Sequence, residues 1–348
     1  MIGSLRWMEN LGLVGFTGAG ANRLFSALTG LPVPSEYEAA VGVASLPDER
    51  LQRLTEMSKS KKTVAAGFEL VHLALPPGSK PGEGLGAKVL GSLRNCDAIL
   101  IVLRAFAEGG VASDPEGDLV ALELELVLAD IASVEQRLTR QRRAAKSGDK
   151  EILAEVEVLE KAHALLSDGT PIRRGSLTAD EIARLGPVFL LTTKPLLLVA
   201  NTGEEVSTDV KMPAGDEVLA VPIDIEAEIA ACAPQDRAEM RESYALGESA
   251  LDAVAQAAYQ MLGRRTFFTT GDDESRAWTF RAGAKAPECA GVIHSDLQRG
   301  FIRAEVIDWR ELLEIGSWAK ARELKKLRVE GKDYEVRDGD VLEIRFNV

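Results

Sequence analysis

The chain has 348 residues, which is enough for two or three domains, or for one large domain that carries an insertion. Its 41 basic and 54 acidic residues give a net charge of −13, which argues against a global electrostatic affinity for nucleic acid or anionic membranes. Three cysteines and three histidines lie far apart in the sequence, without the spacing of a zinc site or a disulfide framework. We therefore expect free thiols and a cytoplasmic location.

Five short apolar runs are separated by stretches with helical spacing, and none is long enough to cross a bilayer. They cover residues 11–16, 68–75, 98–103, 196–200 and 218–221. Buried strands that alternate with helices predict an α/β fold with a mostly parallel sheet and right-handed crossovers.

A glycine-rich loop follows the first of these strands and precedes a helical pattern. Its frame runs from Gly15 through Gly18 to Gly20, as in a phosphate-binding loop. A working loop continues with a lysine, which reaches the outer phosphate oxygens, and a hydroxyl residue, which binds magnesium. Here these two positions hold Ala21 and Asn22. The alternative is that these glycines have only a structural role in the turn, since glycine tolerates positive φ and close packing of strand and helix.

Two long amphipathic patterns interrupt the sheet at residues 119–146 and 152–166, joined by Ser147-Gly148-Asp149. Glycine and aspartate are typical of a helix stop and a helix N-cap, so we expect an inserted antiparallel helical hairpin. The first helix ends in a basic stretch of Arg137, Arg140, Arg142, Arg143 and Lys146. This stretch is either a solvated face with cations placed at a helix C-terminus, or a contact for RNA or an acidic partner.

A third unit begins near residue 265. Segments 267–270, 277–280 and 342–346 favour strands, and helical patterns lie around 309–313 and 318–326. Residues 331–334 and 337–340 are typical of hairpin turns. These patterns predict a small β-grasp-like α+β domain.

The chain resembles the YchF (Obg-like ATPase) family of P-loop GTPases along nearly its whole length. The segments that carry the resemblance are Lys80–Gly86, Glu274–Thr279, Ile293–Asp296, Arg299–Ala304 and the ending from Gly331 to Val348. The resemblance implies a G domain, an inserted helical hairpin and a C-terminal TGS domain. We accordingly expect a G domain at 1–117 and 186–264, the hairpin at 118–185 and the TGS domain at 265–348.

The nucleotide machinery departs from the pattern of the family. The switch I threonine falls near Glu36, and the Asp-x-x-Gly of switch II becomes His72 to Leu75. Together with Ala21 and Asn22, these changes remove the lysine and three magnesium-handling positions. Phosphoryl transfer depends on positioning and charge neutralisation, so these losses argue against hydrolysis. Neither Arg23 nor Lys80 is expected to replace the lysine.

The base-reading Asn-x-x-Glu of the family is matched by Asn201 and Glu204. Asn201 is expected either to bind a purine edge or to brace the phosphate loop, and the string also suits an ordinary turn at a strand end. Residual nucleotide-binding positions are therefore Gly15, Gly18, Gly20, Ala21, Asn22, Asn201 and Glu204, with no catalytic or metal-binding residue. His72 lies on an apolar run and is expected to be a hydrogen-bonded histidine of the core or of the pocket floor, not a catalytic one.

The sequence thus favours a YchF-like pseudo-GTPase that works as a binding module with its hydrolysis lost or severely impaired. The alternative is a true ATP- or GTP-binding nucleotidase with unusual loop chemistry. No cofactor is expected: ATP or GTP would bind weakly, and Mg²⁺ is not expected. The resemblance implies the ribosome or structured RNA as partner, through the hairpin and the TGS domain. We expect a monomer that binds neither DNA nor a membrane.

Overall fold

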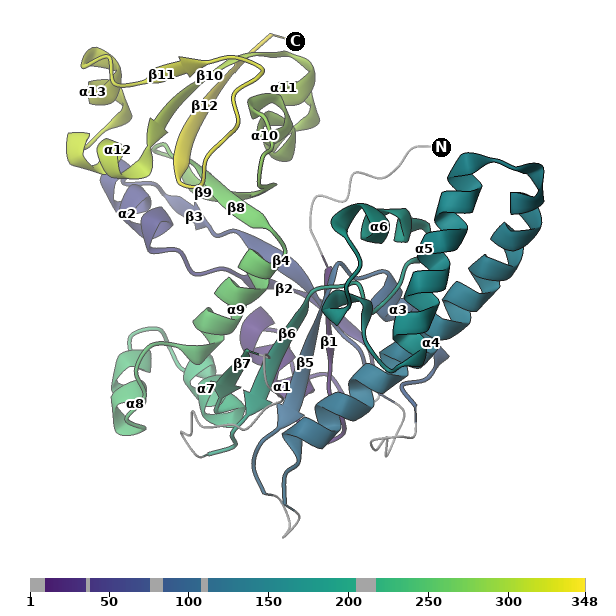
Figure 1. Cartoon of the computed structure of the whole chain (residues 1–348). Helices are drawn as coiled ribbons and strands as arrows, with labels where there is room; N and C mark the ends of the chain where they lie inside the picture. The colour runs from purple at the N-terminus through teal and green to yellow at the C-terminus, as the bar shows by residue number, and fades with distance from the viewer. Residues whose placement is uncertain (1–9, 36–37, 76–83, 108–111, 205–216, 348) are drawn as a thin grey trace. The chain divides into compact units, whose positions relative to one another are not determined.

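The computed structural model describes residues 10–35, 38–75, 84–107, 112–204 and 217–347 (Figure 1). The chain forms two compact units, one of residues 10–42 and 70–254, the other of residues 43–69 together with those from 255 onward. The chain passes between them within β2 (Ala40–Ser45), β4 (Gly67–His72) and α9 (Ala250–Met261). Among the described residues, no helix is long and apolar enough to span a membrane.

A six-stranded sheet organises the first unit, with the strand order β2-β4-β1-β5-β6-β7. Its remaining strands are β1 (Asn10–Val14), β5 (Ala98–Arg104), β6 (Leu196–Asn201) and β7 (Val218–Val221). The pairs β1/β5, β5/β6 and β6/β7 are parallel. Every residue of β1, and every residue of β5 except Arg104, is buried, as expected for central strands covered on both faces. The predicted α/β fold with a mostly parallel sheet is confirmed.

The helices of this unit lie between its strands in the chain or after the last of them. They are α1 (Ala21–Thr29), α3 (Ala87–Arg94), α4 (Pro115–Ala144), α5 (Lys150–Ser167), α6 (Ala179–Arg184), α7 (Ile223–Ala231) and α8 (Arg237–Ser243), with short 3₁₀ turns η1 (Ala145–Ser147), η2 (Ile172–Arg174) and η3 (Gly186–Val188). α4 begins at a proline, and the Asp114 carboxylate caps it by accepting from the Gly117 N–H at 2.9 Å.

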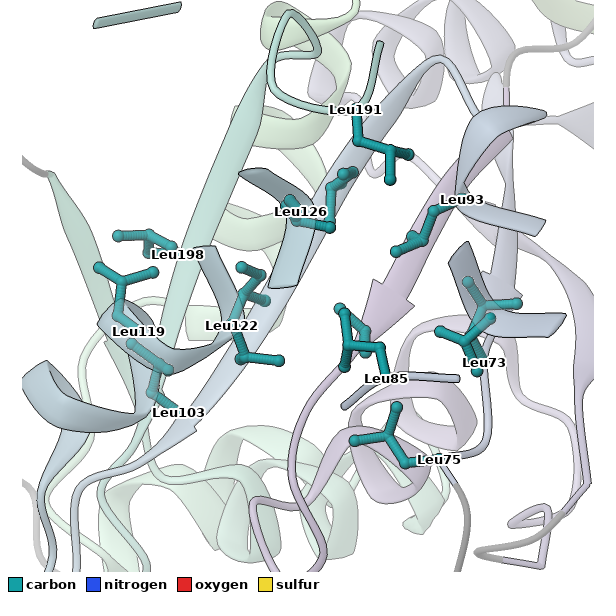
Figure 2. Close-up of a cluster of buried hydrophobic side chains, with 14 residues drawn as sticks. Leu73, Leu75, Leu85, Leu93, Leu103, Leu119, Leu122, Leu126, Leu191 and Leu198 are labelled. Carbon is teal, nitrogen blue, oxygen red and sulfur yellow. The ribbon is translucent and has the colours of Figure 1, made fainter. Parts of the chain in front are cut away.

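One apolar core joins the sheet to α3 and α4 (Figure 2). Leu103 and Leu198 come from the strands, Leu93 from α3, and Leu119 and Leu122 from α4, each no more than 3 % exposed. Leu85 enters the same cluster between Gly84 and Gly86, whose φ angles are 88° and 78°. Positive φ is tolerated best by glycine, which explains the Gly-Leu-Gly string.

The helices α4 and α5 lie side by side as a hairpin (Figure 1). Val134 and Leu138 of α4 pack with Val158, Leu159 and other apolar residues of α5. The Asp149 carboxylate caps α5 by accepting from the Glu151 N–H at 2.8 Å. The connection 145–149 is short, so the two helices run antiparallel.

The second unit is an α+β unit built on another six-stranded sheet, with the order β11-β10-β12-β8-β9-β3. Its strands are β3 (Lys62–Val64), β8 (Arg264–Thr269), β9 (Glu274–Arg281), β10 (Phe301–Asp308), β11 (Arg328–Glu330) and β12 (Asp340–Phe346). Its helices are α2 (Glu49–Ser58), α10 (Ala286–Ile293), α11 (Ser295–Arg299), α12 (Trp309–Ile315) and α13 (Trp318–Glu323).

Residues 43–69 belong to this second unit, although the sequence pattern placed them in the first part of the G domain. β3 pairs in parallel with β9 through Lys62 opposite Glu274, and the two side chains form an ion pair of 2.9 Å. The Ser60 hydroxyl lies 2.7 Å from that of Ser275. The expected division into four segments remains a prediction.

Candidate functional site

The glycine-rich loop between β1 and α1 keeps the backbone of a phosphate-binding loop. Gly18 and Gly20 have φ angles of 84° and 93°. A Cβ on Gly15 would lie 2.7 Å from the Val102 carbonyl oxygen, so only glycine fits there. α1 starts directly after Gly20 without a side-chain cap from that residue. A helix N-terminus of this kind attracts anions through its backbone N–H groups and its dipole.

Asn22 takes up part of this donor capacity itself. Its side-chain oxygen accepts a hydrogen bond of 2.9 Å from the Arg23 N–H, in the first turn of α1. The Arg23 guanidinium forms a 2.5 Å ion pair with Asp224 at the start of α7. The positive charge of Arg23 next to the loop is therefore paired with a carboxylate, and Ala21 carries no charge. Lys80, the other candidate for a replacement, lies outside the described residues.

The cavity beside the loop is small and carries no charged side chain among the described residues. It measures about 30 Å³ and is lined by residues of 15–22 and 72–75. A water molecule needs at least about 10–15 Å³ by this measure, whereas small-molecule sites span about 300–1,000 Å³. The described residues therefore enclose far less space here than a typical small-molecule site does.

His72 and Leu75 lie where we expect the Asp and Gly of switch II. The His72 ring is 4 % exposed, and its Nδ1 lies 3.3 Å from the Glu38 carbonyl oxygen. Burial lowers the pKa of His72, so the ring is neutral at pH 7 and supplies no cation. Leu75 is 6 % exposed and packs into the core of Figure 2, so apolar burial fixes the chain after β4.

Asn201, at the end of β6, is buried, and its side chain forms hydrogen bonds with three backbone groups. Its Nδ2 donates to the Ala19 carbonyl at 3.1 Å, and its Oδ1 accepts from the N–H groups of Gly203 and Ile223 at 3.1 and 3.3 Å. The side chain thereby ties β6 to the glycine-rich loop and to the start of α7. A Cβ on Gly20 would lie 2.6 Å from Asn201 Nδ2, which shows how closely loop and amide pack.

The structure brings most of the expected nucleotide-binding positions together. The same cavity is lined by Gly15, Gly18, Gly20, Ala21 and Asn22. Asn201 does not line it but is hydrogen-bonded to the loop at the Ala19 carbonyl. Glu204 is exposed and does not line the cavity. Glu36, the expected switch I position, lies outside the described residues. Within the described residues, no group of three His, Cys, Asp or Glu side chains could hold a metal ion.

No sequence pattern indicates the contacts that Ile223 and Asp224 make with this loop. Both lie at the start of α7, and they meet Asn201 and Arg23 only through the fold.

The basic end of α4 is partly neutralised by α5. Arg137 pairs with Glu155 at 2.7 Å and Arg142 with Glu160 at 2.8 Å. Arg140 and Arg143 are exposed and have no carboxylate partner among the described residues. Two guanidinium groups therefore remain open on this helix end, in a chain that is acidic overall.

Three comparisons relate the chain to known proteins. Residues 265–347 match a family model described as YchF-GTPase_C, protein of unknown function (DUF933). The "Ribosome-binding ATPase YchF" of Bacillus subtilis (strain 168) is 40 % identical, over 97 % of this chain and 99 % of that protein. The "Obg-like ATPase 1" of Oryza sativa subsp. japonica is 33 % identical, over 97 % and 92 %.

A solved structure resembles the fold over the same extent. The "Structure of the Schizosaccharomyces pombe YchF GTPase" superimposes with a TM-score of 0.85 and 27 % identity, over 97 % of this chain and 98 % of that one.

Proposed function

Because the chain belongs to the YchF (Obg-like ATPase) family, we propose that it is a ribosome-associated member whose nucleotide hydrolysis has been lost or severely impaired. The ribosomal partner is proposed from the names of its relatives, which are called ribosome-binding ATPases. The loss of hydrolysis comes from the site itself. In this proposal the G domain is a scaffold, and the helical hairpin and the C-terminal domain meet ribosomal RNA or protein.

The observation that carries the proposal is the state of the phosphate cavity. Its described lining contains no lysine, no arginine and no carboxylate, and its volume is about 30 Å³. Each lost charge-assisted contact with phosphate weakens binding by about 1.5–3 kcal/mol. The missing lysine alone therefore accounts for at least about 1.5 kcal/mol, a loss of about ten-fold or more in affinity, and the missing hydroxyl also weakens the hold on magnesium.

Two further contacts support a scaffold role for the loop. The Asn22 amide oxygen occupies an N–H of the first turn of α1, and Asn201 is committed to three backbone bonds. Both side chains stabilise the loop without a ligand. A site that is held together by its own amides has less need of nucleotide and magnesium to order it.

The alternative is a nucleotidase with unusual loop chemistry, and one observation favours it. The Thr202 hydroxyl is buried next to Asn201 and has no hydrogen-bond partner among the described residues. A purine edge could supply that partner. The positive φ angles of Gly18 and Gly20 also keep the loop in a phosphate-binding form.

Turnover and ribosome binding test the proposal together. We expect the wild-type chain to release no phosphate from ATP or GTP with Mg²⁺, and to co-sediment with ribosomes equally well with and without nucleotide. The double variant Ala21→Lys/Asn22→Ser should regain nucleotide affinity but not turnover, because His72 and Leu75 remain. Magnesium-dependent turnover by the wild-type chain would establish the alternative. Failure to co-sediment with ribosomes would remove the proposed partner.

A further inference from the structure

A second cavity, far larger than the one beside the glycine-rich loop, lies on the first unit. It measures about 460 Å³ and is lined by α3, α4 and the turn that η3 forms before Phe189. This volume is within the range of small-molecule sites, about 300–1,000 Å³. Nothing in the family resemblance concerns this cavity.

The charges that line this cavity are all positive. Arg94, Arg137 and Arg140 contribute guanidinium groups, of which Arg137 is paired with Glu155 of α5, and no carboxylate is among the lining residues. Arg94 Nη2 donates to the Ala129 carbonyl at 3.1 Å and to the Ser133 hydroxyl at 2.8 Å, which fixes its orientation. Guanidinium groups bind phosphate in a bidentate way, so a cluster of them without a carboxylate favours an anion.

Two of these groups keep donors open. Arg94 Nε is buried without a hydrogen-bond partner among the described residues. Arg140 is exposed and has no carboxylate partner there. A buried donor without a partner is costly, and the exposed Arg140 guanidinium is open to a ligand oxygen.

An exposed aromatic ring stands at the same cavity. Phe189 is 65 % exposed, although the following residues Leu190 and Leu191 are buried. Its φ angle of 55° is unfavourable for a bulky residue, and its N–H is held by the Gly186 carbonyl at 3.1 Å. Strained backbone of this kind gathers at ligand-binding sites. An exposed ring offers a face on which a planar base stacks.

We propose that this cavity binds a nucleotide, with the phosphate on the arginine cluster and the base on Phe189. The shared chemistry is a phosphate next to a planar base, and its source is either a free nucleotide or a nucleotide of single-stranded RNA. The site is separate from the glycine-rich loop, so it does not depend on whether that loop binds ATP.

The test uses the full chain in EDTA, which disfavours magnesium-dependent binding at the loop. AMP is titrated by calorimetry, and a fluorescein-labelled adenylate hexamer by anisotropy, both at low salt. Arg140→Ala and Phe189→Asn are the test variants, since Arg140 is exposed and asparagine tolerates positive φ. Arg143→Ala is the matched control, because it removes an equal charge from α4 outside the cavity.

Arg140→Ala and Phe189→Asn should each weaken binding about ten-fold or more, and Arg143→Ala about two-fold at most. Binding of both probes with this pattern supports a site for free nucleotides. Binding of the hexamer alone, with the same pattern, supports RNA as the source. The proposal is overturned if neither probe binds, if Phe189→Asn has no effect, or if Arg143→Ala weakens binding as much as Arg140→Ala.

Discussion

Asn201→Ala is expected to loosen the glycine-rich loop and its neighbouring strands without any nucleotide present. The substitution removes three buried hydrogen bonds, to the backbone of Ala19, Gly203 and Ile223. At about 1 kcal/mol each, the loss is about 3 kcal/mol, which corresponds to roughly 150-fold faster exchange of amides that open with this unit.

Hydrogen–deuterium exchange measured by mass spectrometry reports the effect locally. Peptides that contain β1 and β6 should exchange faster in Asn201→Ala, while a peptide from β10 in the other unit serves as internal reference. Glu204→Gln is the matched control within the same motif, and it should change nothing because Glu204 is exposed. If β1 and β6 exchange at the wild-type rate in Asn201→Ala, the bracing role is wrong.

Three further outcomes are expected, for Gly20, His72 and Asp130. Gly20→Ala should lower the free energy of unfolding by at least about 2 kcal/mol more than Gly30→Ala, because both have positive φ but only the Cβ on Gly20 would meet Asn201, and chemical denaturation measures the difference. Burial lowers the pKa of His72 from its ordinary value of 6.5, so the unfolded chain binds the proton more tightly and stability is lost as pH falls below about 6.5. His72→Asn should therefore reduce the drop in melting temperature between about pH 7.5 and 5.5, and an unchanged drop would refute this assignment. Asp130→Ala should destabilise by about 3 kcal/mol in denaturation, because the carboxylate accepts from the Leu191 and Thr192 N–H groups at 2.9 and 2.7 Å; a change below about 0.5 kcal/mol would contradict this.

Five of the six strands of the central sheet could be predicted from the sequence because they contain apolar runs, whereas β2, most of whose residues are at least partly exposed, was missed. β5 and β6 begin where the runs begin and end one residue beyond them. β10 was not predicted as a strand, because its residues 301–308 mix exposed Ile302 and Arg303 with buried Phe301 and Ala304. Backbone pairing with β12 stabilises residues 301–308 as a strand, although their sequence pattern does not indicate one.

Contacts between residues far apart in the chain could not be predicted from the sequence. Nothing in residues 43–69 indicates that β3 pairs with β9. That Ala21 and not a lysine follows the glycine-rich frame could be read directly, but the partners of Asn201 and the small cavity depend on the fold. The larger cavity combines Arg94 of α3, Arg140 of α4 and Phe189, which are far apart in the sequence and form no motif.

The two cavities of the first unit differ in a way that bears on function. The one at the glycine-rich loop is about 30 Å³ and has no cation among its described residues, whereas the one at Phe189 is about 460 Å³ and has three arginines. Guanidinium groups, which can bind phosphate, therefore line the cavity at Phe189 and are missing from the described lining at the glycine-rich loop. The two proposals can fail separately, because the variants that test them lie in different cavities.

The most direct test of the central claim is calorimetric titration of the full wild-type chain with ATP and with GTP in the presence of Mg²⁺. Addition of EDTA then reports how much of the binding depends on the metal. We expect no magnesium-dependent binding at millimolar nucleotide, either for ATP or for GTP. Micromolar affinity that disappears on removal of Mg²⁺ would contradict it, because the lysine and the magnesium ligands would then have been replaced by other groups.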